Sequence, residues 1–383
     1  MKKILTMFIA AGFFFSASSV SAEENSLMNG VKSGILIDEN TGMILLEKNA
    51  NEKLPPASMT KIGTLLMIME AIDSGKLKWT DEVQASEEAA SMGGSQVYLK
   101  EGETMTVEEM VKAISVASAN DASVAMAEHL AGSEAALVDQ INKKAKSLGL
   151  TNTTFKNVTG LPAEGHESTA NDMAILAKEL LRHKKITEFT GIYEDFLRQD
   201  AEEPFWLVNT NKLVRSYKGA DGLKTGFTKE AMYCLTATAQ KNNMRLISVV
   251  FGAETSAERN RITAGILDYG FTHYQTKTLY KAGHAIAEVK ISKGAPHEVK
   301  AVIDQPLSWL NDGKKEANVQ KIISVDRDLK APMKKGTQVG SVILKVDGKE
   351  VKELPLLTKH EVKRASWGDL FNRSLLELTD GTK

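Results

Sequence analysis

The chain has 383 residues, of which 42% are hydrophobic and 25% are charged. This composition is typical of a globular protein and excludes a disordered, collagenous or multi-span membrane protein, while the length is sufficient for two or three domains. The chain carries 48 basic and 49 acidic residues, a formal net charge of −1. Because no basic surplus is present to neutralise a phosphate backbone, we expect no nucleic-acid partner.

The first 22 residues have the three parts of a secretory signal peptide. Lys2 and Lys3 supply the charged part, residues 4–15 are apolar, and Val20-Ser21-Ala22 is a small-residue cleavage site. The apolar run is too short to span a bilayer. The sequence therefore predicts a signal peptide over residues 1–22 and an exported mature chain.

A single cysteine and scattered histidines limit the chemistry available to the chain. Cys234 lies in an apolar run, so we expect a buried structural thiol and no internal disulfide. No His or Cys spacing matches a transition-metal site. We therefore predict no metal and no cofactor.

Periodicity predicts a layered domain over residues 27–275. A hairpin is expected at 33–38 and 43–47, followed by a helix from Ser58 and a second helix from Thr106, where Thr106 and Glu109 fit a capping box. Further helical patterns cover 122–130, 135–148 and 171–181. The dense apolar runs 234–239 and 245–251 flank a polar turn and predict antiparallel strands. Strands at both ends of a helical middle indicate an α/β or α+β layered fold with a mainly antiparallel sheet.

The texture changes after residue 280. Short strand-like runs at 286–291, 300–303, 319–325 and 341–346 are broken by Gly, Pro and Asp, which predicts a small β-rich domain over 280–360. Residues 363–378 then read as one amphipathic helix with an apolar face of Trp367, Leu370, Phe371, Leu375 and Leu378. Such a helix either lies on a membrane surface, near the outer face of the cytoplasmic membrane, or packs against protein.

Ser58-Met59-Thr60-Lys61 places a hydroxyl and an amine one helical turn apart. A serine is a weak nucleophile until a base takes its proton, and Lys61 can do so if burial and nearby positive charge keep it neutral. Because both residue types are common, an isolated Ser-x-x-Lys could equally be a capping serine followed by a surface lysine. This spacing occurs only once in the chain.

Two more short motifs follow in order. Ser118-Ala119-Asn120 closes the second helix, where Ser118 could relay a proton from Lys61 and Asn120 could orient Lys61 or a substrate amide. Lys224-Thr225-Gly226 precedes a predicted strand. Lys224 and Thr225 offer a cation and a hydroxyl to a carboxylate, and Gly226 would let a substrate backbone approach the strand.

The three motifs in this order resemble the penicillin-recognising serine D,D-peptidases. The resemblance extends over nearly the whole chain and is to low-molecular-mass D-alanyl-D-alanine carboxypeptidases, in particular the sporulation-associated enzymes of Gram-positive rods. The segments that carry this finer placement are 55–61 and 90–96.

The resemblance implies a role for each matching residue. Ser58 would be the acylated nucleophile, Lys61 its general base and Ser118 the second active-site serine. Lys224 and Thr225 would bind the terminal carboxylate, and the backbone N–H groups of Ser58 and Phe227 would form the oxyanion hole. Phe227 stands where relatives often have His. Arg245 matches a family arginine that helps to hold the carboxylate, although a solvated charge at a strand end is an equal alternative.

The substrate that the resemblance implies is the peptidoglycan pentapeptide stem, which would lose its terminal D-alanine, with β-lactams as inhibitors. The family places the enzyme in cell-wall synthesis, at the membrane surface, in the wall or secreted. A β-lactamase and a non-catalytic penicillin or peptidoglycan sensor remain alternatives. The first would need a Glu-x-x-Leu-Asn loop that the segment 159–172 does not contain, and the second tends to lose residues that are present here.

Overall fold

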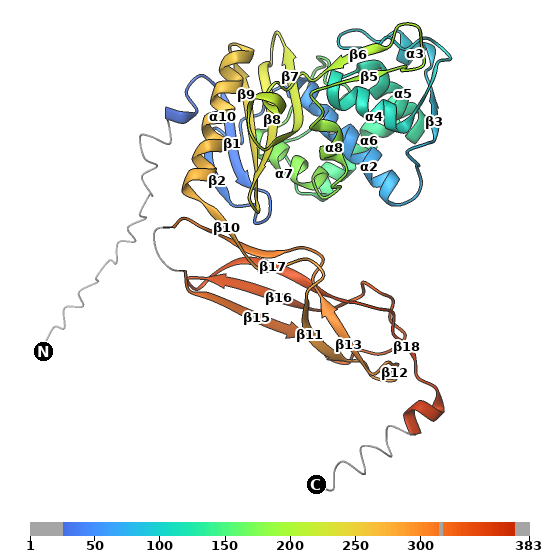
Figure 1. Cartoon of the computed structure of the whole chain (residues 1–383), viewed down its shortest axis with the longest axis vertical. Coiled ribbons are helices and arrows are strands. Elements are labelled where there is room, and N and C mark those ends of the chain that lie inside the picture. Colours follow the sequence, from blue (N-terminus) through green and yellow to red (C-terminus); the bar gives the residue numbers. More distant parts are fainter. Residues whose placement is uncertain (1–25, 314–316, 372–383) are drawn as a thin grey trace, which may run out of the picture.

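The computed structural model describes residues 26–313 and 317–371 (Figure 1). The predicted signal peptide and the last two apolar positions of the C-terminal segment, Leu375 and Leu378, lie outside these residues. Figure 1 shows a larger α/β body above a smaller β-rich body, joined through β10 (Gln275–Tyr280).

The larger body contains a five-stranded antiparallel sheet in the order β2-β1-β9-β8-β7. Its strands are β1 (Ser33–Asp38), β2 (Ile44–Lys48), β7 (Ala220–Thr228), β8 (Met232–Lys241) and β9 (Met244–Ala253). The predicted hairpin and the predicted antiparallel pair are therefore confirmed. This strand order places β7, which contains Lys224-Thr225-Gly226, at one edge of the sheet.

Helices cover both faces of this sheet, which explains why β9 is mostly apolar and is buried at every position but Arg245. Along β9, Leu246 and Val250 pack in the cluster that contains α10 (Ser256–His273), while Ile247 and Val249 pack in the larger cluster on the opposite face. In Figure 1, α10 lies on one side of the sheet and most of the other helices lie on the opposite side.

The helical layer follows the predicted periodicity closely. Its elements are η1 (Ala57–Thr60, a 3-10 turn), α2 (Lys61–Asp73), α3 (Glu87–Ala90), α4 (Val107–Lys112), η2 (Ala113–Ala117, a π-helical turn), α5 (Asn120–Ala131), α6 (Glu134–Ser147), α7 (Ala170–Leu180), α8 (Ile186–Thr190) and α9 (Leu213–Ser216). Two short strand pairs accompany them: β3 (Glu82–Gln84) with β4 (Thr104–Thr106), and β5 (Glu194–Leu197) with β6 (Phe205–Val208). The capping box of Thr106 and Glu109 at the start of α4 is present as predicted.

The smaller body is almost entirely β-structure. A five-stranded sheet has the order β11-β13-β17-β16-β15, with β11 (Ala285–Lys290), β13 (Glu298–Val302), β15 (Val319–Val325), β16 (Gln338–Val346) and β17 (Lys349–Thr358). Two further pairs join β10 to β14 (Leu307–Asn311) and β12 (Gly294–Ala295) to β18 (Lys363–Arg364). This body has its own apolar core, in which Val289, Val342 and Leu356 are buried.

The C-terminal segment differs from the prediction at its start. Lys363 and Arg364 belong to strand β18 rather than to a helix, because they pair with β12. The helix begins at Trp367, after Ser366, whose hydroxyl accepts a hydrogen bond from the backbone N–H of Asp369. Trp367 is 89% exposed and Phe371 is 65% exposed.

Candidate active site

Ser58 and Lys61 occupy the junction of η1 and α2, which gives them the predicted one-turn spacing. Ser58 lies in the 3-10 turn and Lys61 is the first residue of α2. The Nζ atom of Lys61 lies 3.1 Å from Oγ of Ser58. The amine is therefore within hydrogen-bonding reach of the hydroxyl, as a general base must be.

Lys61 is fully buried and two acceptors fix its amine. Its Nζ donates to Oδ1 of Asn120 at 2.6 Å and to the carbonyl oxygen of Thr159 at 2.7 Å. A neutral amine has two N–H donors and one lone pair. With both donors used in this way, the lone pair remains for the hydroxyl hydrogen of Ser58.

The surroundings of Lys61 favour this neutral form. Burial, reinforced by the positive charge of Lys224, holds the pKa of Lys61 well below its usual value of 10.5, against a smaller opposing effect of Asp121. An ammonium group in this position would lose its hydration without gaining a direct carboxylate partner. The burial and the nearby positive charge that a neutral Lys61 requires are therefore both present in the fold.

The second motif lies where η2 gives way to α5. Ser118 ends the π-helical turn in a left-handed conformation with φ of 64°, and the residue is only 3% exposed. Asn120 is the first residue of α5, and its amide group links Lys61 to the loop at Gly93, whose carbonyl oxygen accepts from Nδ2 at 2.7 Å. The motif thus places Asn120 against Lys61, which fits one of the two roles that the sequence analysis left open for Asn120.

The third motif differs from the prediction in one respect: Lys224-Thr225-Gly226 lies inside β7 rather than before a strand. Gly226 lies so close to η1 that a Cβ atom there would be 2.7 Å from the carbonyl oxygen of Pro56 and 3.3 Å from the backbone nitrogen of Met59. This contact brings β7 against the turn that carries Ser58. The next residue, Phe227, has a side chain that is 52% exposed and packs on Tyr233.

Lys224 is buried beside a second cation that the sequence analysis missed. Burial and the positive charge of Arg259 lower the pKa of Lys224 to about 7. Arg259 extends from α10, is only 4% exposed, and has its own pKa lowered to about 10 by burial. Neither side chain forms an ion pair with a carboxylate of the described residues, so the pair is suited to receive an anion.

Arg245 lies elsewhere on the sheet. It stands opposite Gln240 in the β8–β9 ladder, whereas Lys224 stands opposite Thr236. The two terminal nitrogens of its guanidinium donate to the carboxylate oxygens of Asp221, each at 2.7 Å. These contacts fit the alternative of a structural charge near a strand end, and they do not support the carboxylate-binding role expected for Arg245.

Thr210 and His166, which the sequence analysis did not single out, form hydrogen bonds with residues of the motifs. The Thr225 hydroxyl donates to Oγ1 of Thr210 at 2.7 Å. Nδ1 of His166 accepts from the backbone N–H of Lys156, so Nε2 carries the hydrogen and donates to Oγ1 of Thr60 at 2.7 Å. Burial lowers the pKa of His166 to about 4, which keeps this tautomer neutral. Only the folded contacts reveal these roles, because the isolated residue types carry no signal.

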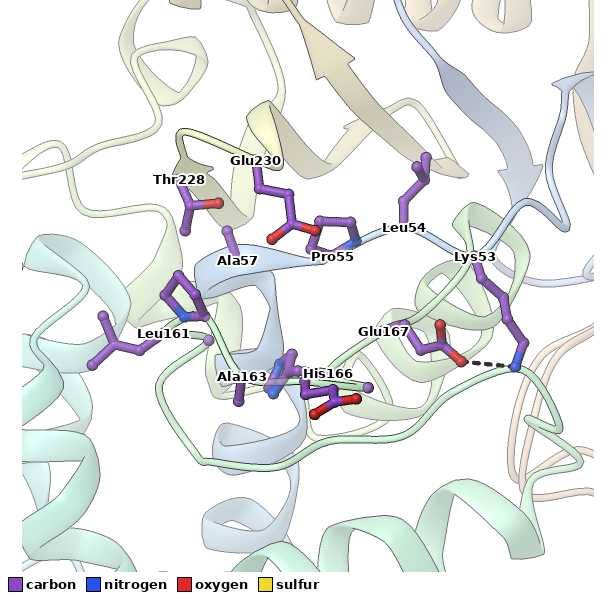
Figure 2. A pocket seen from close by; sticks show the side chains of 14 residues that line it. Lys53, Leu54, Pro55, Ala57, Leu161, Ala163, His166, Glu167, Thr228 and Glu230 are labelled. Atoms are coloured by element: carbon purple, nitrogen blue, oxygen red, sulfur yellow. Dashed lines mark hydrogen bonds and ion pairs between the residues drawn. The ribbon is translucent and has the colours of Figure 1, made fainter.

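A cavity of about 560 Å³ adjoins the segment that leads into η1. Figure 2 shows it between the strip Lys53–Ala57 and the loop that contains Leu161 and His166, with Glu230 extending toward it from the β7–β8 turn. Lys53 and Glu167 form an ion pair of 2.8 Å at one side. The cavity therefore lies beside the turn that carries Ser58 and is lined mainly by residues outside the three motifs.

The sheet flanked by helices and the convergence of three motifs on one serine define a serine hydrolase of the penicillin-recognising fold. The comparisons agree. The sequence profile described as D-alanyl-D-alanine carboxypeptidase matches residues 19–255, and that of the C-terminal domain of penicillin-binding protein 5 matches residues 274–364. The chain therefore belongs to the D-alanyl-D-alanine carboxypeptidase family.

Individual relatives cover both bodies of the chain. It is 49% identical to D-alanyl-D-alanine carboxypeptidase DacF of Bacillus subtilis, with 99% of each chain covered. Identity to DacC of Escherichia coli is 35%, covering 95% of this chain and 93% of that protein. The crystal structures of penicillin binding protein 5 from Haemophilus influenzae match with a TM-score of 0.69 and 30% identity, covering 88% and 98%. Penicillin-Binding Protein D2 from Listeria monocytogenes, in an ampicillin-bound form, matches with a TM-score of 0.57 and 31% identity, covering 63% and 98%.

Proposed function

We propose that this enzyme removes the terminal D-alanine from peptidoglycan pentapeptide stems through an acyl-enzyme on Ser58. The observation that carries the proposal is the buried amine of Lys61, which lies 3.1 Å from the Ser58 hydroxyl with both of its donors already used. β-Lactams would acylate the same oxygen and act as inhibitors.

The acylation step follows from this arrangement. Nζ of Lys61 takes the hydroxyl proton while Oγ of Ser58 attacks the carbonyl carbon of the penultimate D-alanine. The negative charge that develops on the carbonyl oxygen would be stabilised by the N–H groups of Ser58 and Phe227. The proton then passes from Lys61 through the Ser118 hydroxyl to the leaving nitrogen, the peptide bond breaks, and D-alanine departs with its free amine.

Deacylation returns the enzyme to its starting state. A water molecule attacks the Ser58 ester and gives its proton to Lys61, and that proton returns to Oγ as the ester bond breaks. The sum is one peptide plus one water giving a shortened peptide and D-alanine. The pair Lys224 and Arg259 would hold the terminal carboxylate, and the Thr225 hydroxyl would join them by turning its hydrogen from Thr210 to the carboxylate. This explains why the enzyme would trim an end rather than cut an internal bond.

The direct test is D-alanine release from pentapeptide muropeptides, together with mass spectrometry of the penicillin-treated protein. We expect release by the wild-type chain, an adduct on the peptide that contains Ser58, and neither in Ser58→Ala. A labelled Ser58→Ala variant would contradict the assignment. Penicillin binding without D-alanine release would favour the sensor, and rapid penicillin turnover would favour the β-lactamase.

Export and membrane contact form a further part of the proposal. An exported enzyme would meet its substrate in the cell wall, and the 49% identity to DacF supports the placement among carboxypeptidases of Gram-positive rods. In the described part of the chain, no helix is long and apolar enough to cross a membrane. The exposed rings of Trp367 and Phe371 instead suit the interface of an anionic bilayer.

Flotation with anionic liposomes tests the membrane contact. The mature chain should float, and a chain that ends after Ala365, which retains β18, should not. The double variant Trp367→Ser with Phe371→Ser controls for loss of the whole segment and should float poorly as well. Equal flotation of all three proteins would show that the segment does not attach the protein to membranes.

A further inference from the structure

Tyr98 is an exposed aromatic residue in an unfavourable backbone conformation. Its side chain is 67% exposed, although its neighbours Val97 and Leu99 are buried, and its φ is 56°. A bulky residue rarely adopts this left-handed conformation, which is strained for residues other than glycine. Burial does not explain the presence of a large aromatic residue here, because Tyr98 as a whole is mostly exposed.

Two charged side chains hold the backbone on both sides of this tyrosine. The buried carboxylate of Asp121 accepts from the N–H groups of Val97 at 3.1 Å and Leu99 at 3.0 Å. The guanidinium of Arg198 donates to the carbonyl oxygens of Val97 at 3.0 Å and Tyr98 at 3.2 Å. Because the four bonds fix the backbone, the tyrosine is presented rigidly and loses little conformational entropy when it binds a partner.

The same loop is attached to the catalytic residues. Asp121 directly follows Asn120, and the backbone N–H of Asn120 donates to the carbonyl oxygen of Ser95 at 2.7 Å. Three residues of extended chain span at most about 10 Å, so Tyr98 lies within that reach of Ser95 and of the site's edge. Its ring packs edge-on against Phe205, at the start of β6, with centroids 6.0 Å apart.

We propose that Tyr98 is a specificity-determining residue whose ring packs against the peptide stem upstream of the terminal D-alanyl-D-alanine. The ligand class is a peptide long enough to reach beyond the two terminal residues, with aliphatic side-chain surface to cover the ring. The inference rests on the proposed function. It adds a rigid aromatic contact to a site whose motifs recognise only the end of the chain.

The test compares two substrates of different length. The first is the full pentapeptide stem, and the second is an N-acylated D-alanyl-D-alanine dipeptide that ends before it could reach Tyr98. For Tyr98→Gly, kcat/KM for the pentapeptide should fall about tenfold, as expected for loss of a modest apolar contact, while the dipeptide value stays within twofold. Tyr98→Phe keeps the ring and should retain the pentapeptide value.

Thermal stability gives a second, independent measurement. Glycine is at ease at a φ of 56°, so Tyr98→Gly should keep or raise Tm while it loses activity on the long substrate. Asn242→Gly, at an exposed turn with φ of 54°, is the matched control and should leave both kcat/KM values unchanged.

Several outcomes would overturn the inference. An equal loss on both substrates would show that Tyr98 only shapes the site, and an unchanged pentapeptide value would show that the ring does not contact the stem. If the wild-type enzyme released D-alanine from neither substrate, the proposed function itself would fail, which separates the two conclusions.

Discussion

Lys61 and Lys224 are two buried lysines that, in the proposed mechanism, would act in opposite protonation states. Lys61 must be neutral to accept the Ser58 proton, and burial with the charge of Lys224 lowers its pKa accordingly. Lys224 must be charged to attract a carboxylate, yet burial and Arg259 lower its pKa to about 7. A substrate carboxylate placed beside Lys224 would favour the charged form and so raise its pKa.

This difference predicts the pH dependence. Because free Lys224 loses its proton as pH rises through about 7, kcat/KM for a substrate with a free carboxylate should fall on the alkaline side. On the acidic side, kcat/KM should rise with pH as Lys61 is deprotonated. A substrate amidated at its C-terminus should lack the alkaline decrease and react more slowly by roughly 10- to 150-fold, the loss of a charge-assisted hydrogen bond of about 1.5–3 kcal/mol.

Lys224→Met provides the control for this assignment. It should remove most of the difference between acid and amide substrates. It should also raise the pKa of Lys61, because one positive charge is lost nearby, so the acidic limb should move to higher pH. Identical profiles for acid and amide with the wild-type enzyme would contradict the role given to Lys224.

At the scale of elements, the contact between β7 and η1 sets the distance between the nucleophile and the residues that hold the substrate. Gly226 allows this contact, since its position leaves no room for a Cβ atom beside the backbone of Pro56 and Met59. The strand and the turn come from distant parts of the chain, so the site depends on how they pack rather than on either element alone.

Gly226→Ala should therefore separate the two elements. We expect a large loss of penicillin acylation, of at least tenfold, and a destabilisation of about 1–3 kcal/mol from overpacking. Gly265→Ala, in α10 with open space around it, is the control and should stabilise the protein by about 1 kcal/mol without changing acylation. Wild-type acylation in Gly226→Ala would show that the close approach is not required.

At the scale of the whole molecule, the residues of the candidate active site all come from the larger body. Lys352 of the smaller body contacts the larger body, because its Nζ donates to the carbonyl oxygen of Asn40 at 2.6 Å. The same Nζ also donates to the carbonyl oxygen of Pro306, within the smaller body, at 3.3 Å. Burial and the charge of Lys178 lower the pKa of Lys352 to about 8. The Listeria protein matches only 63% of this chain while 98% of its own chain is covered, which supports an independent peptidase unit.

A chain that ends at His273, after α10, should consequently fold and be acylated by penicillin within about threefold of the full-length rate. Stopped-flow or gel-based acylation of the two proteins, with circular dichroism as the check on folding, makes the comparison. A folded but unreactive fragment would show that the smaller body contributes to the site.

The sequence by itself determined the motifs and most of the elements that carry them. The Thr106 capping box and the dense apolar run at residues 245–251 are local patterns, so they predicted the corresponding helix and strand. The resemblance carried by Ser58, Ser118 and Lys224 named the family correctly. The strand that contains Lys224 was not predicted, because the polar and small residues Lys224-Thr225-Gly226 in it conceal a buried strand. The strand that was predicted after this motif is β8.

Only the tertiary structure decided which charges act together. Arg259 approaches Lys224 from another element, whereas Arg245, which lay in the more suggestive sequence position, is held by Asp221. The lowered pKa of Lys61 likewise depends on complete burial and on a neighbour 163 positions along the chain, Lys224. Desolvation and through-space charge depend on distance in the folded molecule, and a linear sequence does not contain those distances.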